Sequence, residues 1–339
     1  MAGFTFEIRN QAGEGINMGD RTVAWLKPIE QLKLSVGKFD GGDNGFRQGT
    51  GFGVWDYVRP SVTTSLFFDG DNGIMDAIGG DGFMAEIFPI EGFKVMVNVP
   101  FLSMVDKKDE DGNYVQQYKD GKWETVLDKE PGVQHAYDIY KKTQIGAAYT
   151  IDGVGELKVL WTNVSEESEL GTKKYNDVGN LGIAFNLSAV ENLNLAIGAK
   201  FDISDKEIDG AGNKAYFATK ASYNVSDAIT FNMVGGIKLF KDDDMDPKWG
   251  IGAGVDYVVM DGLTVNADIR YMSETKYDGN GAEDDSLSFL IAAAKTIGSN
   301  ASLGVGFGGA TNGGGFLTFK AAKTDAFAWC VPVMFNLSF

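Results

Sequence analysis

The sequence predicts an all-β protein, a transmembrane, antiparallel, up-and-down β-barrel of about sixteen strands. Three observations predict it. Apolar and polar residues alternate along most of the chain, very short turns separate alternating segments while long polar stretches follow them, and the chain ends on an alternating segment with an aromatic residue. We expect short periplasmic turns, long extracellular loops and a single barrel domain over residues 1–339.

The alternation is clearest at 193–203, where every odd position is apolar and every even position is polar or small. It recurs at 93–101, 249–259 and 263–271. Successive side chains of a strand point to opposite faces, so these segments predict one apolar and one wet face. The expected strands are 3–10, 20–27, 32–39, 83–89, 93–104, 140–151, 154–163, 178–190, 193–203, 214–225, 228–240, 248–259, 262–273, 286–297, 300–310 and 327–339.

Many of these segments are joined by short turns rich in Asp, Gly, Asn and Ser, such as Asp152-Gly153 and Glu191-Asn192. Such turns are typical of hairpins. Two connections are much longer, 40–82 and 105–134, and loops of more than about 15 residues are usually functional or disordered. Both are candidate constriction loops of equal standing, and we interpret residues 73–78 as a short helix. The candidate constriction residues are Arg47, Asp56, Arg59, Asp109 and Asp111.

The final segment alternates through Trp329, Phe335, Leu337 and Phe339, with smaller or polar residues between them. A chain that ends in this way resembles the C-terminal signal that Gram-negative outer-membrane proteins present to the barrel-assembly machinery. Phe335, Leu337 and Phe339 are therefore candidate assembly-signal residues.

On these features the whole chain resembles a classical sixteen-stranded porin, and residues 24–39 are similar to porins of spirochaete type. The resemblance implies an integral protein of the bacterial outer membrane that contacts its lipid. It also implies passive diffusion of ions and small hydrophilic solutes, a homotrimer, and one loop folded inward. The sequence departs from the classical eyelet, because no acidic loop residues match a clustered arginine ladder. The residues named above for the constriction are therefore candidates, without a matching eyelet pattern to support them.

The wet face is expected to line the pore, since Lys or Arg facing lipid near the midplane costs roughly 2–4 kcal/mol. The predicted pore-lining residues are Arg9, Lys33, Glu86, Lys94, Lys158, Lys200, Lys220, Asp268 and Arg270. The same pattern assigns Glu7, Asp202, Lys214, Lys238, Lys248 and Asp256 to this wall. The wall is mildly basic while acidic runs such as 242–246 lie in loops, so the sequence leaves cation or anion preference open.

Several function classes are disfavoured by composition. The single cysteine and the single histidine, Cys330 and His135, exclude an internal disulfide and remove most metal sites and catalytic schemes. We therefore expect no cofactor, no metal and no enzyme. A net charge of −17 argues against nucleic acid. No run of about 18 apolar residues indicates a membrane helix. No secretory signal is readable before Phe4, so we interpret the chain as a mature form with an added start Met.

Three alternatives to a channel remain. A non-channel barrel that acts as an adhesin, surface antigen or receptor would share every feature above. A barrel enzyme would need a partner for His135 that the sequence does not show. A soluble β-sandwich or solenoid is disfavoured, because one face stays apolar through many strands.

Overall fold

The computed structural model describes residues 1–11, 15–18, 21–40, 45–49, 73–100, 105–106, 116–119, 122–125, 129–130, 143–163, 179–203, 213–241, 245–273, 275–277, 281–283, 285–311 and 327–337. All regular structure in these ranges is β-strand. No helix in these ranges is long and apolar enough to cross a membrane. The short helix expected at 73–78 is wrong, because Gly73–Met75 forms strand β7 and pairs with β6 (Gln48–Gly49).

Seventeen of the strands belong to one sheet, and its described strand pairs are antiparallel. The chain divides into two compact units. Unit one contains Met1–Phe46, Ala77–Ala147 and Trp161–Lys173, and unit two contains Arg47–Asp76, Ala148–Leu160 and Lys174–Phe339. The boundary runs through β14 (Gln144–Ile151) and β15 (Gly155–Thr162).

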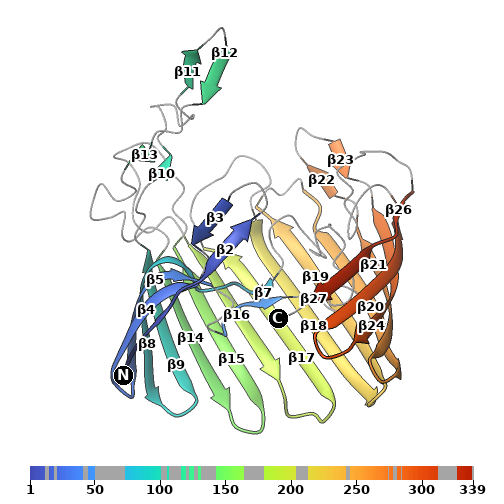
Figure 1. Cartoon of the computed structure of the whole chain (residues 1–339), viewed down its shortest axis with the longest axis horizontal. Helices are drawn as coiled ribbons and strands as arrows, with labels where there is room; N and C mark the ends of the chain where they lie inside the picture. Colours follow the sequence, from blue (N-terminus) through green and yellow to red (C-terminus); the bar gives the residue numbers. More distant parts are fainter. Residues whose placement is uncertain are drawn as a thin grey trace. The chain divides into compact units, whose positions relative to one another are not determined.

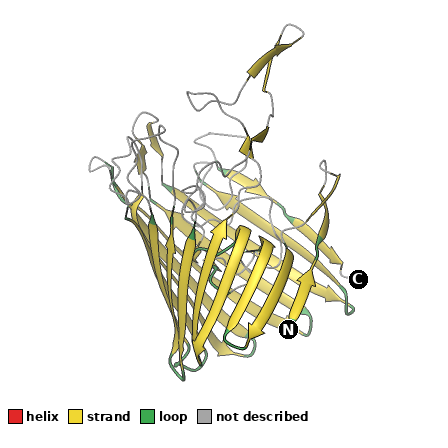
Figure 2. Cartoon of the chain, turned by 90° about the vertical axis from the view of Figure 1, so that its left-hand side faces the viewer, coloured by secondary structure: helices red, strands yellow, loops and turns green. Residues whose placement is uncertain are grey.

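Unit one is a meander in which each strand pairs with the next along the sheet (Figure 2). Its sheet strands are β1 (Ala2–Thr5), β4 (Thr22–Ile29), β5 (Leu32–Phe39), β8 (Gly80–Ile90) and β9 (Phe93–Pro100). Three small two-stranded sheets accompany them: β2 (Ile8–Gln11) with β3 (Gly15–Met18), β10 (Val105–Asp106) with β13 (Lys129–Glu130), and β11 (Gln116–Lys119) with β12 (Lys122–Thr125).

Unit two continues the same pattern through longer strands. They are β16 (Asn180–Leu187), β17 (Leu193–Asp202), β18 (Asn213–Ser226), β19 (Ile229–Phe240), β20 (Lys248–Met260), β21 (Leu263–Met272), β24 (Ser286–Ile297), β25 (Ala301–Ala310), β26 (Ala328–Cys330) and β27 (Val333–Leu337). A small sheet pairs β22 (Thr275–Tyr277) with β23 (Gly281–Glu283).

The last strand explains why the sheet has seventeen segments where the sequence predicts about sixteen strands. β26 and β27 both pair with β25, and they are separated by Val331 and Pro332. Proline has no backbone N–H to donate to the ladder, so it interrupts the strand. The two segments are therefore one terminal strand with a break, and each of the other long sheet strands overlaps one expected segment.

Short turns connect β16 to β17, β18 to β19, β20 to β21 and β24 to β25 at the same end of these strands (Figure 1). Three of these four turns, all but the one between β18 and β19, use the left-handed region of backbone conformation. Gly262 has a φ of 68°, and Asn192 is the described non-glycine residue with positive φ, at 63°. Glycine and asparagine tolerate this conformation at lower cost than other residues, which is why the sequence signals for these turns were readable.

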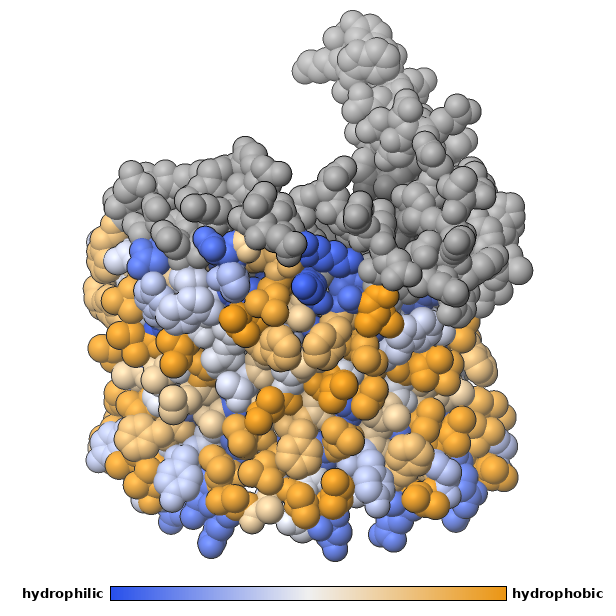
Figure 3. All heavy atoms as spheres, turned by 180° about the vertical axis from the view of Figure 1, so that it is seen from behind, coloured by the Kyte–Doolittle hydropathy of each residue, from blue (hydrophilic) through white to orange (hydrophobic). Residues whose placement is uncertain are grey.

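The two faces of unit two have opposite chemistry. Across β16–β21, β24 and β25, the described odd positions carry one charged residue, Lys295, which lies close to a turn. Large apolar side chains at odd positions stay about half exposed, such as Phe231 at 51% and Met233 at 54%. The even positions in the middle of these strands are largely buried, and they carry polar residues such as Asn232, small residues and a few large apolar ones such as Val234 and Leu290. Figure 3 shows the apolar surface on one face of the molecule, with hydrophilic residues along the lower edge of the described strands.

An apolar outer face with buried polar residues behind it is the reverse of a water-soluble sheet. Contiguous exposed apolar surface of this extent marks a membrane or protein contact. In unit two, residues at the odd positions therefore face lipid, and those at even positions form what we call the polar face. In unit one, the same name is given to the face that carries Lys33, Glu86 and Lys94.

Candidate pore-lining wall

In unit one, the polar face brings together three of the predicted pore-lining residues. Lys33 lies opposite Glu86 in the β5–β8 register, and its Nζ is 2.6 Å from a Glu86 carboxylate oxygen. The other Glu86 oxygen is 3.6 Å from Lys94 Nζ. One carboxylate held between two ammonium groups leaves this patch of the wall with a cationic surplus.

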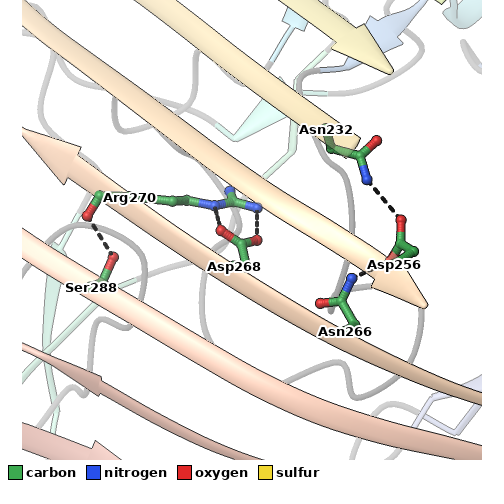
Figure 4. Close-up of polar contacts among 6 residues, drawn as sticks. All are labelled: Asn232, Asp256, Asn266, Asp268, Arg270 and Ser288. Atoms are coloured by element: carbon green, nitrogen blue, oxygen red, sulfur yellow. Dashed lines mark hydrogen bonds and ion pairs between the residues drawn. The ribbon is translucent and has the colours of Figure 1, made fainter. Parts of the chain in front are cut away.

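In unit two, the polar face carries a network across β19–β24 (Figure 4). Arg270 Nε and one terminal nitrogen donate to the two carboxylate oxygens of Asp268, at 2.8 and 2.5 Å. This bidentate geometry is the strong form of a charged pair. Ser288 Oγ lies 3.5 Å from the Arg270 carbonyl oxygen, which ties β24 to β21. Two of the predicted pore-lining residues therefore neutralise each other.

The adjoining part of this network is uncharged apart from Asp256. The Asn232 amide donates to one Asp256 oxygen at 2.7 Å, and the Asn266 amide donates to the other. Ser222 Oγ donates to the Asn232 side-chain oxygen at 2.6 Å. These contacts follow from the registers, since the partners lie on neighbouring strands of one face.

A row of basic residues lies nearer the opposite strand ends. The registers place Lys200 beside Tyr216, Tyr216 beside Lys238, and Lys238 beside Lys248. Lys200 Nζ is 5.5 Å from the centre of the Tyr216 ring, within the range of a cation–π contact. We call these four residues the lysine rung.

Part of the long connection 40–82 lies against this face in unit two. A Cβ built at Gly198 would be 2.5 Å from Ile74 Cγ2, and one at Gly182 would be 3.0 Å from the Met75 sulfur. Gly198 and Gly182 are even-numbered positions on β17 and β16, so Ile74 and Met75 pack into gaps that only glycine leaves. The next residue, Asp76, places a carboxylate oxygen 2.6 Å from Lys200 Nζ.

Residues 77–79 of the same connection form contacts within unit one. The Gln144 side chain donates to the Ala77 carbonyl at 3.1 Å and accepts from the Gly79 N–H at 2.9 Å. Asn98 Nδ2 donates to the Gly79 carbonyl at 2.9 Å. Ile78 is fully buried, and both Ile78 and Phe46 lie over Gly146 of β14. We call residues 74–79 the inward segment, because each unit binds its part on the polar face.

The remaining predicted residues are distributed as follows. Lys158 Nζ lies 3.0 Å from Glu156 on the same strand, and Lys220 occupies the polar face of β18. Arg47 is exposed. Phe335 and Leu337 are exposed apolar residues of β27. The Arg9 side chain, Asp56, Arg59, Asp109, Asp111 and Phe339 lie outside what the structure describes.

The inward segment depends on residues that the sequence did not nominate. Gly146, Gly182 and Gly198 are even-numbered glycines within otherwise regular alternating strands, and this is the signal that could have found them. Asp76 was assigned to a helix, which concealed its role as the acid opposite Lys200.

No protein-family model matches the sequence, and no curated protein matches it. Solved structures do. OccAB4 of Acinetobacter baumannii is 9% identical with a TM-score of 0.52, over 95% of this chain and 75% of that chain. The outer membrane protein OpdK of Pseudomonas aeruginosa is 12% identical with a TM-score of 0.47, over 93% and 78%. OmpT, an outer membrane protein of Vibrio cholerae, is 13% identical with a TM-score of 0.45, over 99% and 94%.

The OccAB4 likeness concerns the fold. With the strand order above, it confirms the predicted all-β, antiparallel, up-and-down barrel. The expected integral location in the bacterial outer membrane is supported, because such barrels cross that membrane with a lipid-facing apolar band like the one formed by the odd positions.

Proposed function

We propose that the chain forms a water-filled channel for the passive diffusion of ions and small hydrophilic solutes across the outer membrane. The observation that supports it is the segregation of charge in unit two: strand charges lie on the polar face, and the midband of the lipid-facing surface has none in the described strands. In a lumen without water, Lys, Arg and Asp at these positions would pay a large desolvation cost, so their presence favours a water-filled lumen.

The inward segment is proposed to be the constriction, and residues 40–82 therefore the constriction loop in place of 105–134. Three glycine gaps, three amide hydrogen bonds and one ion pair fix the segment to the polar face. A loop held at this many points narrows the lumen permanently rather than swinging across it. The nominated Arg47 belongs to the same loop.

A second function is favoured by one specific observation. Several residues of the polar face are almost completely covered: Leu290 is 0%, Ser288 1% and Arg270 3% exposed. A wide, open lumen would leave such residues accessible. The burial supports a narrow passage, and it equally suits a closed barrel that acts as an adhesin, surface antigen or receptor.

Conductance separates these two functions. The purified full-length chain, refolded in detergent and added to a planar lipid bilayer, is expected to give discrete current steps in 1 M KCl. A closed barrel would insert without steps. Insertion is checked independently by β-sheet circular dichroism in vesicles and by a gel mobility that changes on boiling. Inserted, folded protein with no current would overturn the channel.

The remaining assignments belong to this proposal. We expect residues 1–339 to act as a single barrel domain without catalytic function, assembled through Phe335, Leu337 and Phe339 by the barrel-assembly machinery. The porin resemblance also leads us to expect a homotrimer. Chemical cross-linking in native-like detergent, followed by electrophoresis, is expected to give a trimer band.

A further inference from the structure

Near the short turns, the polar face of unit two carries a patch of hydrogen-bonding side chains that extends across strands β17–β21. Its residues occupy two adjacent rows of the registers, with Asn194, Ser222 and Asn232 in one row, and Asn224, Thr230, Asp256 and Asn266 in the other. We call this set the amide belt. Neighbouring strands are about 4.8 Å apart, so β17–β21 together span roughly 19 Å, and several groups of one small solute can contact the belt at once.

The belt is built from neutral hydrogen-bonding groups around a single carboxylate. Both carboxylate oxygens of Asp256 accept hydrogen bonds from amides, one from Asn232 at 2.7 Å and one from Asn266 (Figure 4). Thr230 Oγ1 donates to the Asn224 side-chain oxygen at 2.8 Å. The other members of the belt are also amides or hydroxyls. The belt therefore offers a solute many donors and acceptors rather than a cluster of charges.

The contacts within the belt leave part of its hydrogen-bonding capacity unused. An amide has two N–H donors and an oxygen with two lone pairs. Asn232 uses one donor for Asp256 and accepts from Ser222 at 2.6 Å. Asn266 is only 1% exposed, and within the described residues its side-chain oxygen accepts no hydrogen bond. Buried polar atoms are almost always hydrogen-bonded, so this oxygen indicates a binding partner, and a solute hydroxyl would supply the donor.

The belt is accessible from the short-turn end of the strands. Asn194 and Asn224, which lie closest to the turns of β17 and β18, are exposed. Thr230 and Asp256 are partly exposed, whereas Asn232 is buried like Asn266. Accessibility therefore decreases from the margin of the belt to its deeper part, as expected of a shallow binding surface rather than of a fully solvated wall.

We propose that the amide belt binds uncharged, polyhydroxylated solutes of the sugar and polyol class as they pass through the channel. This inference rests on the proposed channel function and names its substrate class. Sugar hydroxyls both donate and accept, so they match amides, hydroxyls and a carboxylate alike. A solute without hydroxyls leaves the buried polar groups of the belt unpaired, which disfavours its binding. An anionic solute is disfavoured as well, because it meets the like charge of Asp256.

The test is tracer uptake by the full-length protein in liposomes, with radiolabelled D-glucose as the probe and its charged analogues gluconate and glucosamine as competitors. Wild-type uptake is expected to saturate, because bound glucose occupies the belt, and unlabelled glucose should compete better than either analogue. Asn224→Leu and, separately, Thr230→Val should each raise the half-saturation concentration roughly fivefold, the effect of one lost hydrogen bond.

Thr219→Val is the matched control for Thr230→Val. Thr219 lies on the lipid-facing side of β18, and its hydroxyl donates to the Ala196 carbonyl at 3.1 Å. Its loss removes the same chemical group outside the belt, so the half-saturation concentration should stay unchanged.

Conductance in potassium chloride keeps the two claims apart. If folded wild type gives no current, the channel function fails and the substrate class fails with it. If wild type conducts but its glucose uptake rises linearly with concentration, the substrate class alone is overturned. The same holds if gluconate or glucosamine competes as well as glucose, a result that needs no variant, or if Thr230→Val behaves like Thr219→Val. Saturable uptake that the belt variants weaken and the control retains would support the proposal.

Discussion

Two isoleucines on β24 differ in their expected depth in the membrane and in little else, so replacing each of them tests whether this strand crosses a membrane. Ile291 lies in the middle of Ser286–Ile297, and Ile297 is its last residue. Their exposures are nearly equal, 52% and 51%, and both face away from the polar face. Replacing either with Arg is therefore the same chemical change on the same surface of the same strand.

The expected costs differ because the two positions differ in depth. Six residues at about 3.4 Å each, on a strand tilted by about 40°, separate them by roughly 15 Å along the membrane normal. Half of the apolar band is about 12 Å. Ile291→Arg near the midplane should cost roughly 2–4 kcal/mol, and Ile297→Arg at the interface roughly 0–1 kcal/mol. A difference of about 2 kcal/mol is roughly a 30-fold change in the folding equilibrium.

The measurement is urea unfolding in lipid vesicles, followed by the fluorescence of the six tryptophans. The free energy of unfolding should fall clearly for Ile291→Arg and little for Ile297→Arg. Equal losses for the two variants, or no loss for Ile291→Arg, would refute the claim that the odd positions of β24 face lipid.

Two further predictions concern the polar face. Gly198→Ala places a methyl group against Ile74 and should detach the inward segment, which changes single-channel conductance. Gly235→Ala is the control, because the added carbon would lie 3.6 Å from its nearest neighbour and should leave the conductance unchanged. Identical conductance in the two variants would contradict the anchoring role of Gly198. Asp268→Ala should lower the free energy of unfolding by about 3 kcal/mol, because Arg270 loses the carboxylate that binds two of its nitrogens. The double variant with Arg270→Ala should lose at least about 1 kcal/mol less than the sum of the single variants, and strict additivity would show that the pair is not coupled.

Much of the fold could be predicted because its governing pattern is local. A strand has a period of two, so 193–203 shows its apolar and wet faces within eleven letters of sequence. The turns are equally local: Asn192 and Gly262 sit where a positive φ is needed. The break in the last strand is also local, because Pro332 alone causes it. Its effect on the number of strands followed only from the structure, in which β26 and β27 both pair with β25.

The candidate site could be predicted only in its composition. Alternation assigned Lys33, Glu86, Asp268 and Arg270 to one face, and in the structure they lie on the polar face. That this face lines a pore stays a prediction. It could not show that Asp268 neutralises Arg270, or that Glu86 is shared by two lysines, because such pairings depend on side-chain geometry across strands.

The sequence by itself determined that this chain is a sheet with one lipid-facing and one polar side, since residue type and period are properties of neighbouring positions. Only the tertiary structure decided which connection lies on the polar side. Asp76 and Lys200 are 124 residues apart, and no local pattern relates them. Their contact exists because glycines at 182 and 198 leave room for Met75 and Ile74, a fit between surfaces that the chain creates only when it is folded.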